Sequence, residues 1–225
     1  MTPDLVHLAL RNTHRLIPSR FPPVGIPDVI ASPEDLPLIL ELEGWTNDRI
    51  SAELGILPLI PAADWVVGEP HASVIMAAFC HPRPGGGRFH DEDRGAWYAA
   101  LDLDTAIAEV VHHRTQEFRE IGVFDARVQM RQYLADFDAP FHDIRGDTAA
   151  NRPFHASDSY QASQALGRDL RAAGSNGVCY RSVRRPGGAC LACFRPRLVR
   201  NVRPAAHFES TWAGSPVPIV RQVAG

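Results

Sequence analysis

Prolines divide the chain into two unequal parts. Ten of its 19 prolines lie in residues 1–70, in runs such as "IPSRFPPVGIPD". Proline has no amide hydrogen to donate within a helix or sheet, and it also restricts the residue before it. We therefore expect residues 1–70 to form an extension of short helices joined by extended turns and packed on a core. Residues 71–225 are expected to form that core, within a single domain.

Regular elements are predicted mainly after residue 71. Three segments have strand-like composition, namely residues 96–103, 177–183 and 189–194, the last two joined by the hairpin sequence "RRPGG". Two segments have helical spacing, namely residues 105–118, capped by Asp104, and a helix that starts at Ser157 or Asp158 and closes at Gly174. The periodicity of the segment "HASVIMAAF" does not distinguish a helix from a strand. Because strands and helices mix without a βαβ rhythm, the predicted class is α+β.

Composition and charge argue against nucleic-acid and membrane partners. The 225 residues carry a net charge of −3, without a basic stripe. Residues 33–55 read as one or two helices ending at Gly55, and residues 46–56 look like the first half of a helix-turn-helix. However, Pro58 and Pro61 would break the recognition helix that must follow. No apolar run approaches the roughly 20 residues that span a bilayer.

The N-terminus indicates the compartment of the protein, and the spacing of its cysteines and histidines argues against a metal site. The first residues lack a secretory cleavage pattern, so we expect a cytoplasmic protein with its four cysteines reduced. Cys190 and Cys193 have CxxC spacing, but positions three apart in a strand face opposite sides. His112 and His113 are adjacent on a helix and diverge by roughly 100°. Neither pair is expected to bind a metal ion.

Four side chains are candidates for ligand chemistry, although each has a plainer explanation. Arg88 follows three glycines, which let a backbone approach a ligand, and its guanidinium matches phosphate oxygens. Tyr98 follows Trp97 in a strand, so the two rings face opposite sides and at most one serves a core. Ser182 ends a strand, where a hydroxyl usually bonds locally.

Glu109 is the fourth candidate. It lies opposite an apolar helix stripe of Ile107, Val110, Val111 and Phe118. A surface glutamate in water is the plain alternative.

Several stretches of the sequence together resemble a known family. They are "GGRFH", "WYAA", "TAIAEVVHH", "YQASQAL" and "GVCYRSVRRPGGACLACFRP", which cover most of residues 85–196, and "HRLIPSRFPP" near the start. The chain is similar to the RES-domain family, the toxin half of bacterial RES–Xre toxin–antitoxin pairs. The resemblance implies a split β core with surrounding helices, as in ADP-ribosyltransferases. One departure is His90, where many relatives have asparagine, followed by an unusually acidic run.

The resemblance also implies an activity and its residues. NAD would be the substrate, consumed by hydrolysis or phosphorolysis, and no metal would be needed. The family's arginine, tyrosine, glutamate and serine correspond to Arg88, Tyr98, Glu109 and Ser182, and a further N-terminal arginine to Arg15, with Arg20 as its competitor.

Partners and alternatives follow from the same resemblance. An Xre-family antitoxin is the implied partner, in a complex that could contain a toxin homodimer. Some relatives resemble toxins that ADP-ribosylate a protein such as phosphoribosyl pyrophosphate synthetase. A non-catalytic protein that binds a nucleotide or the antitoxin is the alternative of a different class.

The chemistry of NAD agrees with a site that has one carboxylate. Nicotinamide leaves as a neutral molecule, so no acid has to protonate it, whereas ordinary glycosidases need two carboxylates. Glu109 would stabilise the positive charge that develops at the ribose C1′. Arg88 would hold the pyrophosphate with help from Arg15. The sequence has no GxGxxG fingerprint, which argues against a dehydrogenase that uses NAD as a hydride carrier.

Overall fold

The computed structural model describes residues 2–19 and 59–224. The helices predicted within residues 33–55, the helix-turn-helix segment and Arg20 therefore lie outside the described residues. The strands are β1 (Leu5–Pro18), β2 (Trp97–Ala100), β3 (Asp125–Asp143), β4 (Gly177–Arg181), β5 (Ala189–Cys193), β6 (Arg200–Ala213) and β7 (Ile219–Val223). The α-helices are α4 (Ala72–Cys80), α5 (Leu103–Ile121) and α6 (Gln161–Ala172).

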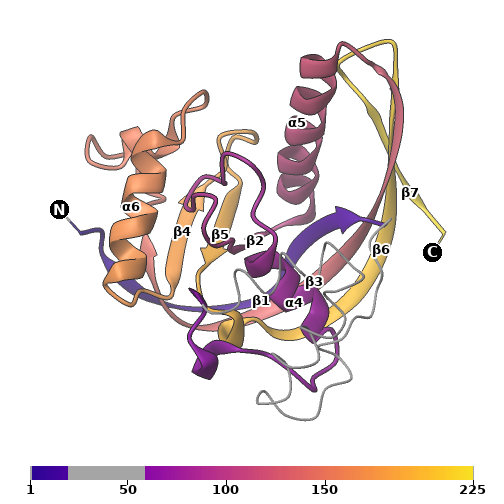
Figure 1. Ribbon diagram of the computed structural model, residues 1–225. Helices are drawn as coiled ribbons and strands as arrows, with labels where there is room; N and C mark the ends of the chain where they lie inside the picture. Colours follow the sequence, from indigo (N-terminus) through magenta and orange to yellow (C-terminus); the bar gives the residue numbers. More distant parts are fainter. Residues whose placement is uncertain (1, 20–58, 225) are drawn as a thin grey trace.

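The described strands form one sheet with two narrow junctions. Their order is β1-β2-β5-β4-β3-β6-β7, and β1 also pairs with β3. A single residue pair, His14 with Ala100, joins β1 to β2. Two pairs join β3 to β4, which is the parallel contact of the sheet. The sheet is thus split into β2-β5-β4 and β1-β3-β6-β7 (Figure 1), and the predicted α+β class with a split core is confirmed.

The expectation of short helices is wrong for residues 5–18, which form β1. This strand pairs with β3 from Leu5 opposite His142 to Pro18 opposite Met130. Its proline does not interfere because it is the last residue of the strand. A bulge near Asn12, whose φ is 55°, shifts the register between Leu10 and Thr13, and the pairing with β3 continues on both sides of it. Residues 5–18 therefore belong to the sheet, and the domain boundary at residue 70 stays a prediction.

The helices differ from their predicted limits at their N-terminal ends. α5 is capped by Asp102, whose carboxylate accepts a hydrogen bond from the Thr105 amide at 2.8 Å, and not by Asp104. α6 begins at Gln161 and not at Ser157 or Asp158. The ambiguous "HASVIMAAF" forms α4, whereas the hairpin loop between β4 and β5 is as predicted.

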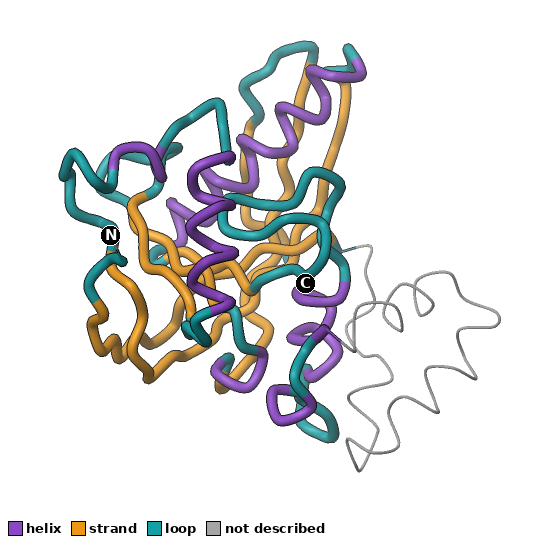
Figure 2. The backbone as a smooth tube through the Cα atoms, turned by 60° about the vertical axis from the view of Figure 1, so that its left-hand side comes forward, coloured by secondary structure: helices purple, strands orange, loops and turns teal. Residues whose placement is uncertain are grey.

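The predicted apolar stripe of α5 is not its buried side. The buried residues are Thr105, Ala106 and Thr115, while Ile107, Val110, Val111 and Phe118 are only half-buried. The small polar side chains allow close contacts, and Thr115 accepts a hydrogen bond from the Trp212 indole. Figure 2 shows α5 running alongside the long strands. None of the helices in the described residues is long and apolar enough to span a bilayer.

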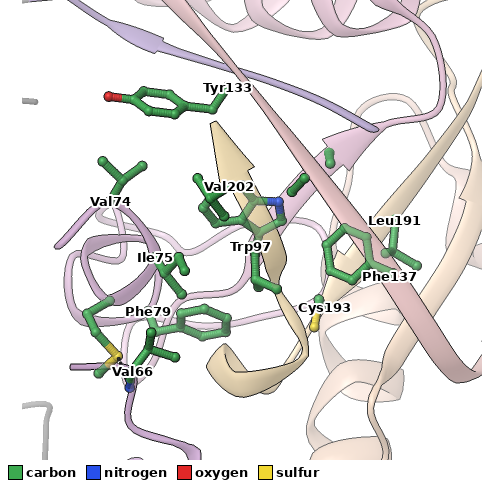
Figure 3. Packing of buried hydrophobic residues seen from close by; sticks show 14 of the residues in the cluster. Val66, Val74, Ile75, Phe79, Trp97, Tyr133, Phe137, Leu191, Cys193 and Val202 are labelled. Carbon is green, nitrogen blue, oxygen red and sulfur yellow. Dashed lines mark hydrogen bonds between the residues drawn. The ribbon is translucent and has the colours of Figure 1, made fainter. Parts of the chain in front are cut away.

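Two apolar clusters lie on opposite faces of strands β2, β4 and β5. The first contains Trp97, Cys179 and Cys193 together with side chains of α4 and β3. Figure 3 shows Trp97 surrounded by Phe79, Phe137 and Val202. The second cluster lies under α5 and α6. The three strands contribute Ala100, Val178, Tyr180 and Cys190 to this cluster, and the two helices contribute Ala106 and Leu170. Tyr98 packs against it.

Strand alternation explains this division. Trp97 and Tyr98 face opposite sides of β2, and Cys190 and Cys193 face opposite sides of β5, both as predicted. The face that carries Tyr98 also carries the candidate site.

Candidate functional site

A cavity of about 300 Å³ opens on the face of the sheet that carries Tyr98. Four of the predicted site residues line it: Arg15 from β1, Arg88 from the loop before β2, Tyr98 from β2 and Glu109 from α5. Ser182 is not part of the lining, but its side chain contacts the Glu109 carboxylate. The structure therefore brings all five predicted residues together.

Ser182, which lies outside the cavity lining, forms a hydrogen bond with the Glu109 carboxylate. Its hydroxyl donates a hydrogen bond of 2.6 Å to Glu109 Oε1. The Ser182 hydroxyl oxygen itself accepts hydrogen bonds from the amides of Arg184 (3.0 Å) and Arg185 (3.1 Å). These two donors orient the hydroxyl proton towards Glu109, because a hydroxyl has only one proton to give. Ser182 is therefore placed to position the carboxylate.

Glu109 lies on the side of α5 that faces the cavity. The helix presents Ala106, Glu109, Val110 and His113 to the cavity, with the spacing of one helix face. The surface-glutamate alternative is thus excluded by the half-buried position and the contact with Ser182. The expectation that Glu109 lies opposite the core side of the helix is therefore wrong, because the buried Ala106 lines the same cavity, as does Val110 of the predicted stripe.

Arg88 is buried and oriented by backbone carbonyl groups. Its side chain is 6% exposed. The Nη1 atom donates to the carbonyl oxygens of Phe154 (3.2 Å) and Ala156 (2.9 Å), and the guanidinium carbon lies 4.7 Å from the centre of the Tyr160 ring. Within the described part of the chain, no protein group accepts a hydrogen bond from Nε or Nη2 of Arg88. These donors remain for an anionic ligand.

Tyr98 connects the strand to the loop that carries Arg88. Its hydroxyl accepts a hydrogen bond of 2.9 Å from the Phe89 amide. Burial raises the pKa of Tyr98 to about 12, so the phenol stays protonated at neutral pH. The His90 ring packs edge-on against it, with centroids 5.5 Å apart. Gly87 is required here, because a Cβ atom at this position would lie 2.6 Å from the His90 ring.

Arg15 reaches the cavity through the short junction between β1 and β2. Its Nη1 donates to the Tyr98 carbonyl at 3.1 Å, and its guanidinium lies 4.8 Å from the Trp97 ring centroid. Its Nε is buried and has no hydrogen-bond partner in the described residues. Burial lowers the pKa of Arg15 to about 10, and the side chain still carries its charge at neutral pH.

The cavity lining is positively charged. Among the described residues it contains four arginines, namely Arg15, Arg83, Arg88 and Arg114, and one carboxylate, that of Glu109. Arg83 and Arg114 bind the two oxygens of Glu117, which lies outside the lining, at 2.9 and 2.5 Å. Arg15 and Arg88 form no ion pair with a described carboxylate. This arrangement suits a ligand that carries negative charge.

Sequence reasoning missed part of the lining. Tyr160, His90, Arg83 and Arg114 also line the cavity. Tyr160 opens the stretch "YQASQAL", but no local pattern indicates that its ring lies under an arginine 72 positions earlier. Arg114 follows Glu109 by five residues, which places the two side chains about 140° apart around a helix, so helical spacing did not indicate that both line one cavity.

Metal ligands are not gathered at this site. The described residues contain no group of three or more His, Cys, Asp or Glu side chains that could hold a metal ion. The four cysteines are buried, and none forms a disulfide within the described residues. Burial raises the pKa of Cys179 to about 11 and that of Cys193 to about 12, which keeps both thiols protonated.

The chain is similar to known proteins in sequence and in structure. Uncharacterized protein y4oC of Sinorhizobium fredii (strain NBRC 101917 / NGR234) is 26% identical over 211 residues, which cover 92% of this chain and 85% of that protein. The crystal structure of the M. tuberculosis MbcT-MbcA toxin-antitoxin complex matches with a TM-score of 0.47 at 12% identity, over 89% of this chain and 86% of that chain. The RES domain profile matches residues 63–213, and the chain therefore belongs to the RES domain family.

Proposed function

We propose that this protein is a toxin that consumes NAD by cleaving the bond between nicotinamide and ribose. One observation carries the proposal. Among the described residues that line the cavity, four are arginines and one, Glu109, is a carboxylate. The Ser182 hydroxyl donates a hydrogen bond of 2.6 Å to that carboxylate. A dinucleotide presents the matching groups, because its pyrophosphate is anionic and its reacting sugar carbon becomes positive as the bond breaks.

Glu109 would stabilise the reacting sugar. Its carboxylate lowers the energy of positive charge at C1′ and accepts hydrogen bonds from ribose hydroxyls. It can also orient an attacking water or phosphate. Ser182 would act through Glu109, since its proton is already donated to that carboxylate and cannot also bind the substrate. This assigns Ser182 a positioning role.

The arginines and Tyr98 would bind the rest of NAD. Arg88 offers Nε and Nη2 to the pyrophosphate, and Arg15 adds a second positive charge. Tyr98 would contact the nicotinamide with its ring, while its hydroxyl accepts a hydrogen bond from the Phe89 amide and keeps its own proton to donate. No general acid is required, in agreement with a lining that has one carboxylate.

Nicotinamide release tests the activity. Purified protein is incubated with NAD labelled in its ADP-ribose part, with and without inorganic phosphate. Free nicotinamide with soluble ADP-ribose, or with its 1″-phosphate when phosphate is present, supports the proposal. Label retained on a protein would favour ADP-ribosylation of a protein target. Growth inhibition that survives Glu109→Ala would favour a non-catalytic protein and count against both enzymatic functions.

The partner and compartment belong to the same proposal. A toxin that consumes NAD has to be neutralised in the cell that makes it, and the family resemblance implies an Xre-type antitoxin in the cytoplasm. A neighbouring reading frame that encodes a small helix-turn-helix protein would support this partner, and that protein, when co-expressed, should restore growth and co-purify with the toxin. Failure of that protein to bind would remove the partner from the proposal.

A further inference from the structure

We infer that Gln164 is a positioning residue that holds the Arg88 loop in its ligand-binding conformation. This inference rests on the proposed function for the nature of the ligand, but the contacts stand independently of it. Gln164 lies on α6, outside the cavity lining. The two protons of its side-chain amide are shared among three backbone carbonyl oxygens of one loop, those of Gly85 (2.9 Å), Gly87 (3.2 Å) and His90 (3.3 Å).

Two of these carbonyl groups precede Arg88 in the sequence and the third follows it. The loop turns sharply, with positive φ at Gly85 (76°) and Gly86 (73°), and closes with a hydrogen bond of 2.9 Å from the Gly87 amide to the His90 carbonyl. Glycines can rotate their peptide groups at little cost, so such a loop needs an external partner to keep one conformation. Gln164 is a donor that satisfies carbonyl groups on both sides of Arg88 at once.

A second contact brings α6 against the same loop. Gly167 lies one turn after Gln164, and a Cβ atom there would lie 2.2 Å from the Phe89 carbonyl oxygen. Only glycine allows the helix backbone to come this close. Phe89 is fully buried and packs edge-on against Tyr180 at 4.9 Å between ring centroids. The helix therefore presses on the loop from one side while Gln164 binds its carbonyl groups.

These contacts orient the hydrogen-bond donors that Arg88 offers to a ligand. The Arg88 side chain already depends on carbonyl groups of residues 154 and 156, which precede α6. α6 and the segment before it thus hold both the backbone and the guanidinium of Arg88. A preorganised arginine binds phosphate oxygens without first ordering its loop. Loss of the Gln164 amide should therefore weaken anion binding through Arg88, without removing any ligand contact of its own.

Amide hydrogen exchange tests the positioning directly. Gln164→Met keeps the side-chain size and removes both donors, and Gln161→Ala is the control, an exposed glutamine on the same helix. We expect faster exchange at residues 85–90 in Gln164→Met and no change in the control. Unchanged exchange in Gln164→Met would overturn the inference. Circular dichroism and thermal unfolding show whether each variant is folded.

A double-mutant cycle tests whether Gln164 acts through Arg88. Affinity for ADP-ribose is measured by calorimetry at low ionic strength, where weak binding stays measurable. Gln164→Met should weaken binding about tenfold in the wild-type background and leave it unchanged in an Arg88→Ala background. Equal losses in both backgrounds would contradict the inference. A wild-type protein that neither releases nicotinamide nor binds ADP-ribose would refute the proposed function, while the exchange rates would still decide the role of Gln164.

Discussion

The two faces of the β2-β5-β4 strands differ in chemistry although they share the same backbone. On one face, Trp97 and Cys193 are fully buried among apolar side chains of α4 and β3. On the other face, Tyr98 borders a cavity with arginines and Glu109. One residue step along β2 changes a core position into a site position, because successive side chains of a strand point in opposite directions.

This difference separates stability from ligand chemistry. The first face is closed by α4, so its residues contribute mainly through burial. The second face is covered only in part, because the cavity that Glu109 of α5 and Tyr98 of β2 line remains open on it. We expect substitutions on the first face to change the free energy of unfolding and those on the second face to change activity. Three predictions test this separation, and a fourth concerns the pH dependence of stability at His90, which lines the cavity.

Trp97→Ala should have the largest effect and should act on stability. Removal of a fully buried indole costs about 3 to 5 kcal/mol of the free energy of unfolding, as for other large-to-small core substitutions. Urea denaturation measures it. Tyr98→Phe, at the next position, is the comparison, and should cost about 1 to 3 kcal/mol because the Phe89 amide loses its acceptor. Similar losses in both variants would argue against the separation of the faces.

Glu109→Gln should act on catalysis and leave the fold intact. The amide oxygen can still accept the hydrogen bond from Ser182, but the negative charge is lost. We expect nicotinamide release to fall on the order of 100-fold or more, about 3 kcal/mol in the barrier. Glu120→Gln is the matched control, an exposed carboxylate on the same helix. A Glu109→Gln enzyme with wild-type kcat would remove the proposed mechanism.

Ser182→Ala should have a smaller catalytic effect than Glu109→Gln. It leaves the carboxylate in place without the hydroxyl that orients it, so we expect about a tenfold lower kcat, near 1.4 kcal/mol. Ser182→Thr keeps the hydroxyl and should retain more activity than Ser182→Ala. Steady-state kinetics of both variants make the comparison. Losses as large as that of Glu109→Gln would mean that Ser182 contacts the substrate itself.

His90→Asn should change the pH dependence of stability. Burial, with the nearby Arg171, lowers the pKa of His90 from 6.5 to about 4. Between these values the unfolded chain binds a proton that the folded protein does not, so wild-type stability falls as the pH drops from about 6.5 to about 4. The slope from this residue is at most about 1.4 kcal/mol per pH unit. Urea denaturation over this range should show a shallower dependence for His90→Asn, and parallel curves would contradict the assignment.

Local patterns predicted those parts of the fold that depend on neighbouring residues. Gly174, with φ of 74°, follows α6 as expected, and the "RRPGG" loop joins β4 to β5. β1, β3, β6 and β7 were not predicted. The ladders of β1, β3 and β6 join distant segments, as where Leu5 pairs with His142, and their sequences mix polar and apolar residues on partly exposed surfaces. Strand formation there depends on a partner that no short window contains.

Local sequence patterns likewise predicted only part of the candidate site. Periodicity placed Glu109 away from the predicted stripe, but only the family resemblance connected it with Ser182, 73 positions later. The Arg15 position depends on the pairing of β1 with both β2 and β3, in a segment where helices were expected.

The amino-acid sequence by itself determined the alternation that sends Trp97 and Tyr98 to opposite faces, the glycines of the Arg88 loop and the hairpin that carries Ser182. Each of these follows from the geometry of a few adjacent residues. Only the tertiary structure decided that Glu109 meets Ser182, that Arg15 reaches Tyr98, and that Gln164 binds the loop of Arg88. These contacts join residues that are far apart in the chain, and their geometry depends on sheet register and helix packing over the whole domain.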